Sequence, residues 1–347
     1  MTHDRIVLVH VSDPHCAGIL NNKWFGDVPA LSGHDVLLAE ALPNAMQDAA
    51  ARHGLESPDD LVVAMTGDLT HYGTADQFSV GREILSSAGK ITSRRVFMIP
   101  GNHDHWDGRP RWLVDVGAYN AAIFASSGRE PAPFESTPWR AVVPSSGGGF
   151  HLHLYGVDSN SGLVRHRYNL PAVGRIADSE FARLWNAMKA EGSDGAGPVI
   201  RVLLCHHSMT RELTCPWVGP LDEQSRNRIL ATWRFGVLDA ALTGHTHHFH
   251  EREYRPDPGV DRGSFWERRS ASVLKGRATA GKQGFFVHVL TKDPGTGQVD
   301  WIAERYLWDG SRFSLVIHAS SRVSHPVGRR AGRPKRPRRP KSGTFDM

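Results

Sequence analysis

Short apolar runs that end in polar residues recur along the chain from residue 5 to residue 247. Such runs predict buried strands, because each is brief, rich in Val, Leu and Ile, and followed by polar turn-forming residues. Six of them cover 5–13, 61–68, 95–104, 150–160, 199–208 and 237–247. Beyond residue 260 the pattern is again typical of strands, over 264–276, 284–293 and 299–308. By contrast, the Ser-, Gly- and Pro-rich segment 126–149 predicts a loop or an insertion.

Two stretches between these strands predict helices. Residues 36–54 form a helical pattern that ends at Gly54, with Pro43 as an interruption within it. Residues 176–192, ended by Gly192, place four apolar side chains on one helix face, at Phe181, Leu184, Trp185 and Met188. Strands and helices in this arrangement predict an α/β fold. A chain of 347 residues can bury a full core in one large domain or in two smaller ones.

Composition narrows the class of protein. The apolar fraction of 40% is ordinary for a globular domain, and no stretch approaches the roughly 20 apolar residues that a membrane-spanning helix needs. The N-terminal sequence MTHDRIVLVH lacks the basic and apolar regions of a secretion signal. Three cysteines, Cys16, Cys205 and Cys215, are a sparse and odd-numbered set that argues against a disulfide framework. Together these features predict a cytoplasmic protein without a membrane span.

The net charge of +5 is concentrated at the C-terminus. Residues 322–347 hold nine Lys or Arg and one acid, Asp346, so that removing this +8 leaves the rest of the chain at −3. This segment is rich in Pro, Gly and Arg and poor in apolar residues, which predicts a disordered tail after a domain that covers residues 1–321. The tail could attract nucleic acid or another acidic surface by charge, or serve only for solubility.

The polar ends of five predicted strands share one chemistry. They are SDPH (12–15), GDLTH (67–71), GNHDH (101–105), CHHS (205–208) and GHTHH (244–248). In α/β proteins the ligand site lies beyond the carboxyl ends of the strands, so these five ends should converge. Asp, Asn and His supply the oxygen and imidazole nitrogen donors that divalent Mn, Fe or Zn can use. The sequence therefore predicts a site for two divalent metal ions that share a bridging carboxylate.

In this order the motifs D-x-H, G-D, G-N-H-D, H-H and G-H-x-H resemble those of the calcineurin-like metallophosphoesterases. The resemblance implies a four-layered α/β/β/α sandwich. It also implies that Asp68 bridges two metal ions, whose other ligands are Asp13, His15 and His247 for the first ion and Asn102, His206 and His245 for the second. His103 matches a histidine outside the metal ligands that assists the leaving group or steadies the phosphate, so that Asp68 and His103 become the expected catalytic residues.

Some positions leave alternatives open. His206 is preferred to His207 as the ligand, because it lies nearer the strand and aligns with the family's single ligand. His71 stands where many relatives have a second aspartate that orients His103, which leaves the way His103 is held unexplained. Two further histidines stay unassigned, as substrate contacts or as loop residues: His248 and His250.

The favoured function is that of a phosphodiesterase in which a metal-bridging hydroxide attacks phosphorus. GDLT, GNHD and CHHS look closest to bacterial phosphodiesterases that act on cyclic nucleotides or glycerophosphodiesters. The motifs contain no arginine, which favours a diester because it carries one negative charge fewer than a monoester. Arg109 and Arg111, just after GNHDHW, weaken this reasoning. Tyr72, where serine/threonine protein phosphatases have an arginine, argues against that class.

Two other functions are compatible with the same residues. A nuclease of the same superfamily would use the basic tail to attract DNA or RNA. A non-catalytic scaffold would keep the fold and bind a partner, although all seven ligand positions are filled here and degenerate relatives usually lack one or more. The β-rich region after residue 260 could help to form a dimer, but nothing in the pattern requires one.

Overall fold

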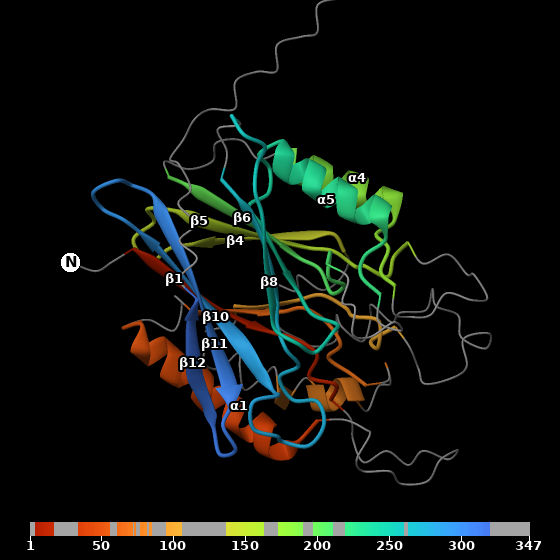
Figure 1. Cartoon of the computed structure of the whole chain (residues 1–347), viewed down its shortest axis with the longest axis vertical. Coiled ribbons are helices and arrows are strands. Elements are labelled where there is room, and N and C mark those ends of the chain that lie inside the picture. Colours follow the sequence, from red (N-terminus) through yellow and green to blue (C-terminus); the bar gives the residue numbers. More distant parts are fainter. Residues whose placement is uncertain are drawn as a thin grey trace, which may run out of the picture.

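The computed structural model describes residues 4–16, 34–55, 61–71, 73, 77–81, 83–84, 95–105, 137–162, 173–189, 197–210, 219–259 and 263–319. These ranges contain the helices α1 (Val36–Arg52), α4 (Asp178–Lys189) and α5 (Glu223–Arg234) (Figure 1). One sheet consists of β1 (Arg5–Val11), β2 (Leu61–Met65), β3 (Val96–Met98), β10 (Gly284–Lys292), β11 (Val299–Trp308) and β12 (Phe313–Ala319). The other consists of β4 (Trp139–Pro144), β5 (His151–Gly156), β6 (Val199–Leu204), β7 (Ala240–Thr243), β8 (His250–Tyr254) and β9 (Phe265–Arg269).

The strand order and direction place the polar motifs at the carboxyl ends of neighbouring parallel strands. The first sheet has the order β12-β11-β10-β1-β2-β3 and the second β4-β5-β6-β7-β9-β8. Strands β1, β2 and β3 are parallel to one another, and so are β5, β6, β7 and β9. Because parallel strands finish at the same edge of a sheet, the segments that follow them leave each sheet together.

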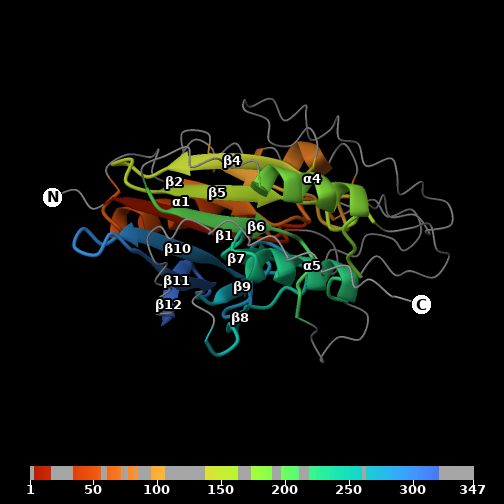
Figure 2. The same cartoon turned by 90° about the horizontal axis from the view of Figure 1, so that it is seen from above.

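Strand β1 shows why the two sheets stack. Its alternate side chains Val7 and Val9 pack in a core with α1, whereas Ile6 and Leu8 pack in a second core with β5, β6 and β7. A third core joins the far face of the second sheet to α4 and α5. Figure 1 shows the resulting layers from the side, with α1 outside one sheet and α4 and α5 outside the other, and Figure 2 shows α4 and α5 in front of the second sheet. The α/β/β/α sandwich is thereby confirmed, and the continuous apolar run of β1 follows from burial on both faces.

Helix α1 runs through Pro43 without a break, so the predicted interruption was wrong. Asp35 caps the helix by accepting a hydrogen bond from the backbone N of Leu37 at 2.9 Å. Proline inside a helix costs roughly 3 kcal/mol, and each Leu or Met side chain buried against the sheet contributes roughly 1.5–3 kcal/mol. The buried face has Leu38, Leu42 and Met46, with the small Ala45 and Ala49 between them, so the burial of the three large side chains outweighs that cost.

Four elements were missed by the prediction, namely β4, α5, β8 and β12. Strand β4 lies inside the segment predicted to be a loop, and it forms an edge strand that pairs with β5 and exposes Arg140. Helix α5 was missed because its sequence EQSRNRILATWR is mostly polar, with Ile229 and Trp233 as its buried apolar side chains. The predicted apolar face of α4 holds for Leu184 and Met188, both buried, while Phe181 and Trp185 are half-buried.

Several expectations fall on residues outside the described ranges, namely the tail 322–347, Gly192, Cys215, Tyr72, Arg109 and Arg111. Cys16 and Cys205 are both buried free thiols. No helix in the described part of the chain is long and apolar enough to cross a lipid bilayer.

His10 makes the stability of this fold sensitive to acid. The side chain is fully buried on β1 and its Nε2 lies 3.0 Å from Thr66 Oγ1. Burial lowers the pKa of His10 from 6.5 to about 3. Between pH 6.5 and about pH 3, His10 is protonated in the unfolded chain and neutral in the folded chain. The fold therefore loses about 1.4 kcal/mol of stability for each pH unit below 6.5.

Replacing His10 by Gln should remove this loss and keep a polar group near Thr66. Between pH 7 and pH 5, the free energy of unfolding should fall by about 2 kcal/mol less in His10→Gln than in the unchanged protein. Urea unfolding at the two pH values in the presence of a chelator measures the difference. Equal pH dependence in both proteins would show that His10 is protonated as easily in the fold as in the unfolded chain.

Candidate metal centre

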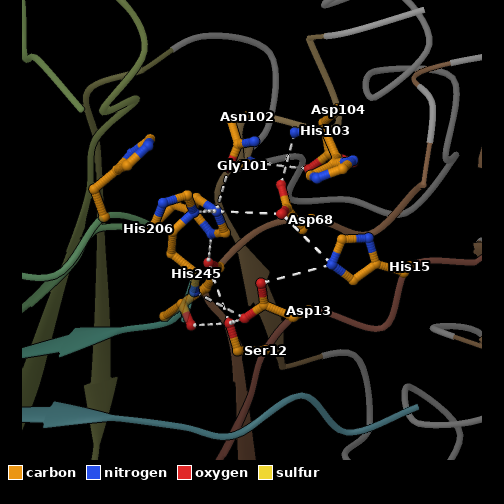
Figure 3. Close-up of polar contacts among 12 residues, drawn as sticks. Ser12, Asp13, His15, Asp68, Gly101, Asn102, His103, Asp104, His206 and His245 are labelled. Atoms are coloured by element: carbon orange, nitrogen blue, oxygen red, sulfur yellow. Dashed lines mark hydrogen bonds and ion pairs between the residues drawn. The ribbon is translucent and has the colours of Figure 1, made fainter. Parts of the chain in front are cut away.

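The ends of strands from both sheets converge on one cluster of polar side chains (Figure 3). Asp13, Asp68 and Asn102 follow β1, β2 and β3 of the first sheet, and His206 and His245 follow β6 and β7 of the second. Backbone hydrogen bonds from Asp13 N to Gly67 O, at 3.1 Å, and from His15 N to Asp68 O, at 3.0 Å, continue the pairing of β1 with β2 beyond the sheet. The predicted convergence of strand ends is therefore present in the structure.

The backbone is strained at the predicted metal ligands. Within the described residues, positive φ angles outside glycine occur at five positions: Asp13 (51°), His15 (48°), Asp68 (53°), His245 (79°) and His247 (60°). Left-handed backbone is uncommon for residues with a side chain, and a sparsely populated conformation costs on the order of 1–3 kcal/mol. All five belong to the predicted ligand set, so the fold holds its strain where side chains must turn inward.

Two glycines make room for this arrangement. A Cβ on Gly67 would lie 2.7 Å from His206 Nδ1, and a Cβ on Gly101 would lie 2.1 Å from Asp68 Oδ1. Gly67 also has a φ of 95°, which a residue with a side chain rarely adopts. The glycines of the G-D and G-N-H-D motifs are therefore required by close packing around Asp68 and His206.

One group of donor atoms comes from Asp13, His15 and His247, and these atoms all lie within 4.8 Å of one another. Asp13 Oδ1 is 3.3 Å from His247 Nε2 and 3.8 Å from His15 Nε2, and it is buried without a well-formed hydrogen bond to the described residues. Its other oxygen, Oδ2, accepts hydrogen bonds from Ser12 Oγ at 2.5 Å and His245 N at 3.0 Å. Asp13 is thus held by one oxygen and presents the other to the two imidazoles.

A second group comes from Asn102, His206 and His245. His206 Nε2 lies 3.0 Å from Asn102 Oδ1 and 3.2 Å from His245 Nδ1. The opposite nitrogen, Nδ1, is 2.7 Å from the carbonyl oxygen of Thr66, to which it donates. A metal-ligating histidine is commonly oriented in this way, with one ring nitrogen bonded to a carbonyl and the other directed at the ion.

Asp68 lies between the two groups. Its Oδ2 is 3.3 Å from His206 Nε2 and 3.7 Å from His15 Nε2, so that one carboxylate oxygen faces a histidine from each group. Its Oδ1 accepts a hydrogen bond from the backbone N of His103 at 2.8 Å. This is the position that a carboxylate shared by two cations would need.

Charge in the centre is balanced against burial. Burial alone would raise the pKa of Asp68, but the charges of His206 and His103 hold it well below its ordinary value. Burial alone would lower the pKa of His206, yet Asp68 and Asp13 raise it to about 9. Burial and the charge of His206 lower the pKa of His245 to about 3. A proton on His206 offsets the carboxylates, and a bound cation would have to replace it.

His103 is held by the main chain of His71. His103 Nδ1 donates to the carbonyl oxygen of His71 at 2.7 Å, and the two rings stack with centroids 5.4 Å apart. The question left open by the missing aspartate therefore has a structural answer, because a backbone carbonyl supplies the acceptor. The ring of His103 also meets the ring of His15 edge to face at 4.6 Å.

Comparison with known proteins now places the chain in a family. The sequence profile of the calcineurin-like phosphoesterases matches residues 6–249, about 70% of the chain. The chain belongs to the calcineurin-like phosphoesterase family. No curated protein sequence matches it significantly. The resemblance drawn from the motifs is therefore confirmed at the level of the family.

Three solved structures that are similar to this calcineurin-like phosphoesterase have low sequence identity to it. A putative 5′-nucleotidase from Staphylococcus aureus, in complex with alpha-ketoglutarate, is 13% identical with a TM-score of 0.47, over 93% of this chain and 54% of that one. YfkN, a calcineurin-like phosphoesterase from Bacillus subtilis, is 12% identical with a TM-score of 0.41, over 93% and 91%. The NAD nucleotidase of Haemophilus influenzae is 12% identical with a TM-score of 0.40, over 92% and 50%. The chain spans about half the length of the first and the third.

The donor atoms of this phosphoesterase suit divalent cations. Asp13 Oδ1 is a buried carboxylate oxygen that faces imidazole nitrogens, and Asp68 Oδ2 has the same surroundings. Both groups combine oxygen with nitrogen and contain no thiolate, which matches Mn, Fe or Zn. The strained backbone at five of the seven positions costs folding free energy, which a bound cation would offset. The residues present therefore match the two-cation centre that the family implies.

Two residues of the phosphoesterase site had no assigned role in the sequence. Asp104, the last residue of G-N-H-D, accepts hydrogen bonds from Thr70 N at 2.9 Å and Gly101 N at 2.9 Å, which ties the loop after β2 to the loop after β3. Burial and the charge of Asp68 raise the pKa of Asp104 to about 6. Lys275 lies in the loop after β9 and is half-buried, and no motif pointed to it.

Lys275 brings positive charge close to the first donor group. Its backbone N donates to Ser272 Oγ at 3.1 Å, and that hydroxyl donates to the carbonyl oxygen of Asp13 at 2.6 Å. Burial lowers the pKa of Lys275, while the charges of Asp13 and Asp68 act in the opposite direction. The loop is thus fastened to the end of β1, with its ammonium group within electrostatic reach of the centre.

The remaining histidines of the motifs lie around the two donor groups. His207 is next to His206, with its Nδ1 2.7 Å from Ser159 Oγ and its ring 4.3 Å from that of His245. His105 forms a buried ion pair with Asp158 at 3.0 Å. Two others lie further along the chain: exposed His248, and His250, which begins β8 and is therefore not a loop residue.

Proposed function

We propose that this calcineurin-like phosphoesterase is a metal-dependent phosphoester hydrolase and that its substrates are phosphodiesters. One observation carries the proposal, which is that Asp68 Oδ2 faces His15 on one side and His206 on the other, at 3.7 and 3.3 Å. A carboxylate placed between two sets of nitrogen and oxygen donors is the arrangement that two-metal hydrolases use for in-line displacement at phosphorus.

Seven residues would hold the cations. One cation would be bound by Asp13, His15 and His247, and the other by Asn102, His206 and His245. Both would be bound by Asp68. Two divalent ions in these positions would supply a water of lowered pKa as the nucleophile and positive charge for the phosphate oxygens. The identity of the ions, Mn, Fe or Zn, follows from availability as much as from this donor set.

His103 would transfer a proton to the departing oxygen. With Nδ1 bonded to the His71 carbonyl at 2.7 Å, the proton exchanged with a leaving group would be carried by Nε2. The backbone N of His103 is bonded to Asp68 Oδ1, which fixes the imidazole relative to the bridging carboxylate. General acid catalysis needs this kind of fixed geometry more than it needs a particular pKa.

The charge around the centre favours a diester over a monoester. Within the described residues, Arg268 and Arg269 are fully buried, where Arg268 pairs with Glu251 and Arg269 donates to Ser208 Oγ. Lys275 is the cation whose charge reaches the carboxylates of the centre. A monoester brings a second negative charge, which a guanidinium fork would suit best, and these two buried arginines are engaged elsewhere.

The test compares two generic esters. Mn²⁺-loaded protein should hydrolyse bis(p-nitrophenyl) phosphate with a higher kcat/KM than p-nitrophenyl phosphate, as followed by nitrophenolate release. A preference for the monoester would replace the proposal with a phosphomonoesterase. No turnover of either ester by protein that carries two ions per chain would favour the scaffold. Cyclic nucleotides, glycerophosphodiesters and single-stranded DNA form the next panel, and turnover of DNA alone would favour the nuclease.

Three features of the whole protein belong to this proposal as well. A metallophosphoesterase domain would cover residues 1–321, with the basic segment 322–347 as a separate tail. The location would be cytoplasmic, consistent with free, buried thiols at Cys16 and Cys205. The substrate would be a small phosphoester, with nucleic acid as a second partner if the tail contributes to binding.

A further inference from the structure

His71 contacts both His15 and His103. Its side-chain Nδ1 lies close to His15, and its backbone carbonyl bonds to His103. His71 follows β2 in GDLTH and is only 8% exposed. Its Nδ1 is 3.4 Å from His15 Nδ1, and its ring meets that of His15 edge to face with centroids 5.5 Å apart. Its carbonyl oxygen accepts from His103 at 2.7 Å. The main chain of His71 therefore bonds to His103, whereas its side chain is the group that offers a ring nitrogen to His15.

The contact between the two Nδ1 atoms has a direction. Two imidazole nitrogens at hydrogen-bond distance share one proton, so one ring donates and the other accepts. On its other edge, His15 turns Nε2 toward Asp13 Oδ1 at 3.8 Å, Asp68 Oδ2 at 3.7 Å and His247 Nε2 at 3.1 Å. For Nε2 to act as a ligand it must keep its lone pair, so the proton of His15 belongs on Nδ1. His15 is then the donor and His71 the acceptor.

We infer that His71 is a positioning residue for His15, which holds the tautomer and ring orientation that His15 needs to bind a cation together with Asp13 and His247. This inference rests on the metal centre of the proposed function, and it deepens that proposal. A histidine ligand whose outer partner is lost typically binds its ion 10–100-fold more weakly. Only the donor group that contains His15 should be affected, since the other group is oriented through Thr66.

The chain offers a matched pair of variants. In His71→Asn the side-chain Oδ1 occupies nearly the place of Nδ1 and still accepts a hydrogen bond. In His71→Leu a methyl group stands there instead, with similar bulk. Both variants keep the carbonyl that holds His103, and both lose the ring that stacks on His103. The comparison of the two variants therefore isolates the hydrogen-bond acceptor for His15. The exposed His248, replaced by Leu, is the control for loss of a histidine near the centre.

Metal binding gives a readout that does not depend on turnover. Zn²⁺ titration against a chelator should show two ions per chain in the unchanged protein and in His248→Leu. In His71→Leu one of the two should bind roughly 10–100-fold more weakly, while His71→Asn stays within a few-fold of the unchanged protein. Cadmium NMR of the loaded His71→Asn variant should show one resonance shifted and one in place, which keeps the test open if His71→Leu does not fold.

Three results would overturn the inference. They are unchanged affinity for both ions in His71→Leu, equal losses in the Asn and Leu variants, and three ions in the unchanged protein. The third result would mean that His15, His71 and His103, whose donor atoms also lie within 4.8 Å, hold an ion of their own. Failure of the proposed function is a separate result, because a protein that binds two ions and hydrolyses neither ester would leave the role of His71 intact.

Discussion

Asp68→Asn should lower kcat/KM for bis(p-nitrophenyl) phosphate by roughly 100- to 1,000-fold or more. The carboxylate lies between His15 and His206, and an amide there removes the negative charge that both cations would share. Asparagine has nearly the same shape and can still accept the hydrogen bond from His103 N, so the fold should persist. The measurement is steady-state hydrolysis together with metal content, which should fall below two ions per chain.

Asp257→Asn is the control for Asp68→Asn, since this aspartate is exposed and lies outside the motifs. It should leave both turnover and metal content unchanged. Asp68→Asn protein that retained turnover within about tenfold of the control would mean that the carboxylate is not shared by two ions. The central observation behind the proposed function would then have to be abandoned.

His103→Gln should have an effect that depends on the leaving group. Loss of a general acid costs roughly 10²–10⁴-fold when the departing oxygen needs a proton, as in a nucleoside cyclic phosphate that releases an alkoxide. Nitrophenolate is a stable anion and leaves without help, so its release should fall by less than about tenfold. The comparison is the ratio of kcat/KM for the two diesters in the variant and in the unchanged protein.

Equal losses on the two diesters would assign His103 a different task. The residue would then steady the phosphate, which is the other role implied by its motif, and would not donate a proton. Whether the unchanged protein accepts a cyclic phosphate must be established first. Any alkyl diester that it hydrolyses can take that place, because the reasoning concerns only the basicity of the departing oxygen.

Much of the site could be predicted from the sequence because it follows strands. An apolar run followed by Gly-Asp or Gly-His identifies a residue at the carboxyl end of a strand. The carboxyl ends of parallel strands lie together in a sheet, independently of the conformation of the loops between them. The strand pattern by itself predicts an α/β fold, and the sandwich could be predicted because the motifs indicate the family. Strain at Asp13 and Asp68 could not be predicted, since no residue type with a side chain favours a positive φ there.

Other parts of the molecule have no local signal in the sequence. Lys275 belongs to no motif, and its loop is joined to Asp13 through hydrogen bonds of Ser272. The acceptor for His103 is a backbone carbonyl, which every residue at position 71 would provide. Helix α5 buries few apolar side chains against the second sheet, so its periodicity is weak. Each of these features depends on tertiary contacts that a single sequence does not display.

The two donor groups have a mechanical consequence for the sandwich. Each combines ligands from both sheets, with Asp13 and His15 after β1 joined to His247 after β7, and Asn102 after β3 joined to His206 and His245. An ion in either group would act as a cross-link over a long stretch of chain, in a protein whose described cysteines are unpaired. The concentration of metal would then determine how strongly the two sheets are held together. Loss of metal would lower the stability of the fold and increase its cleavage by proteases, in addition to removing its activity.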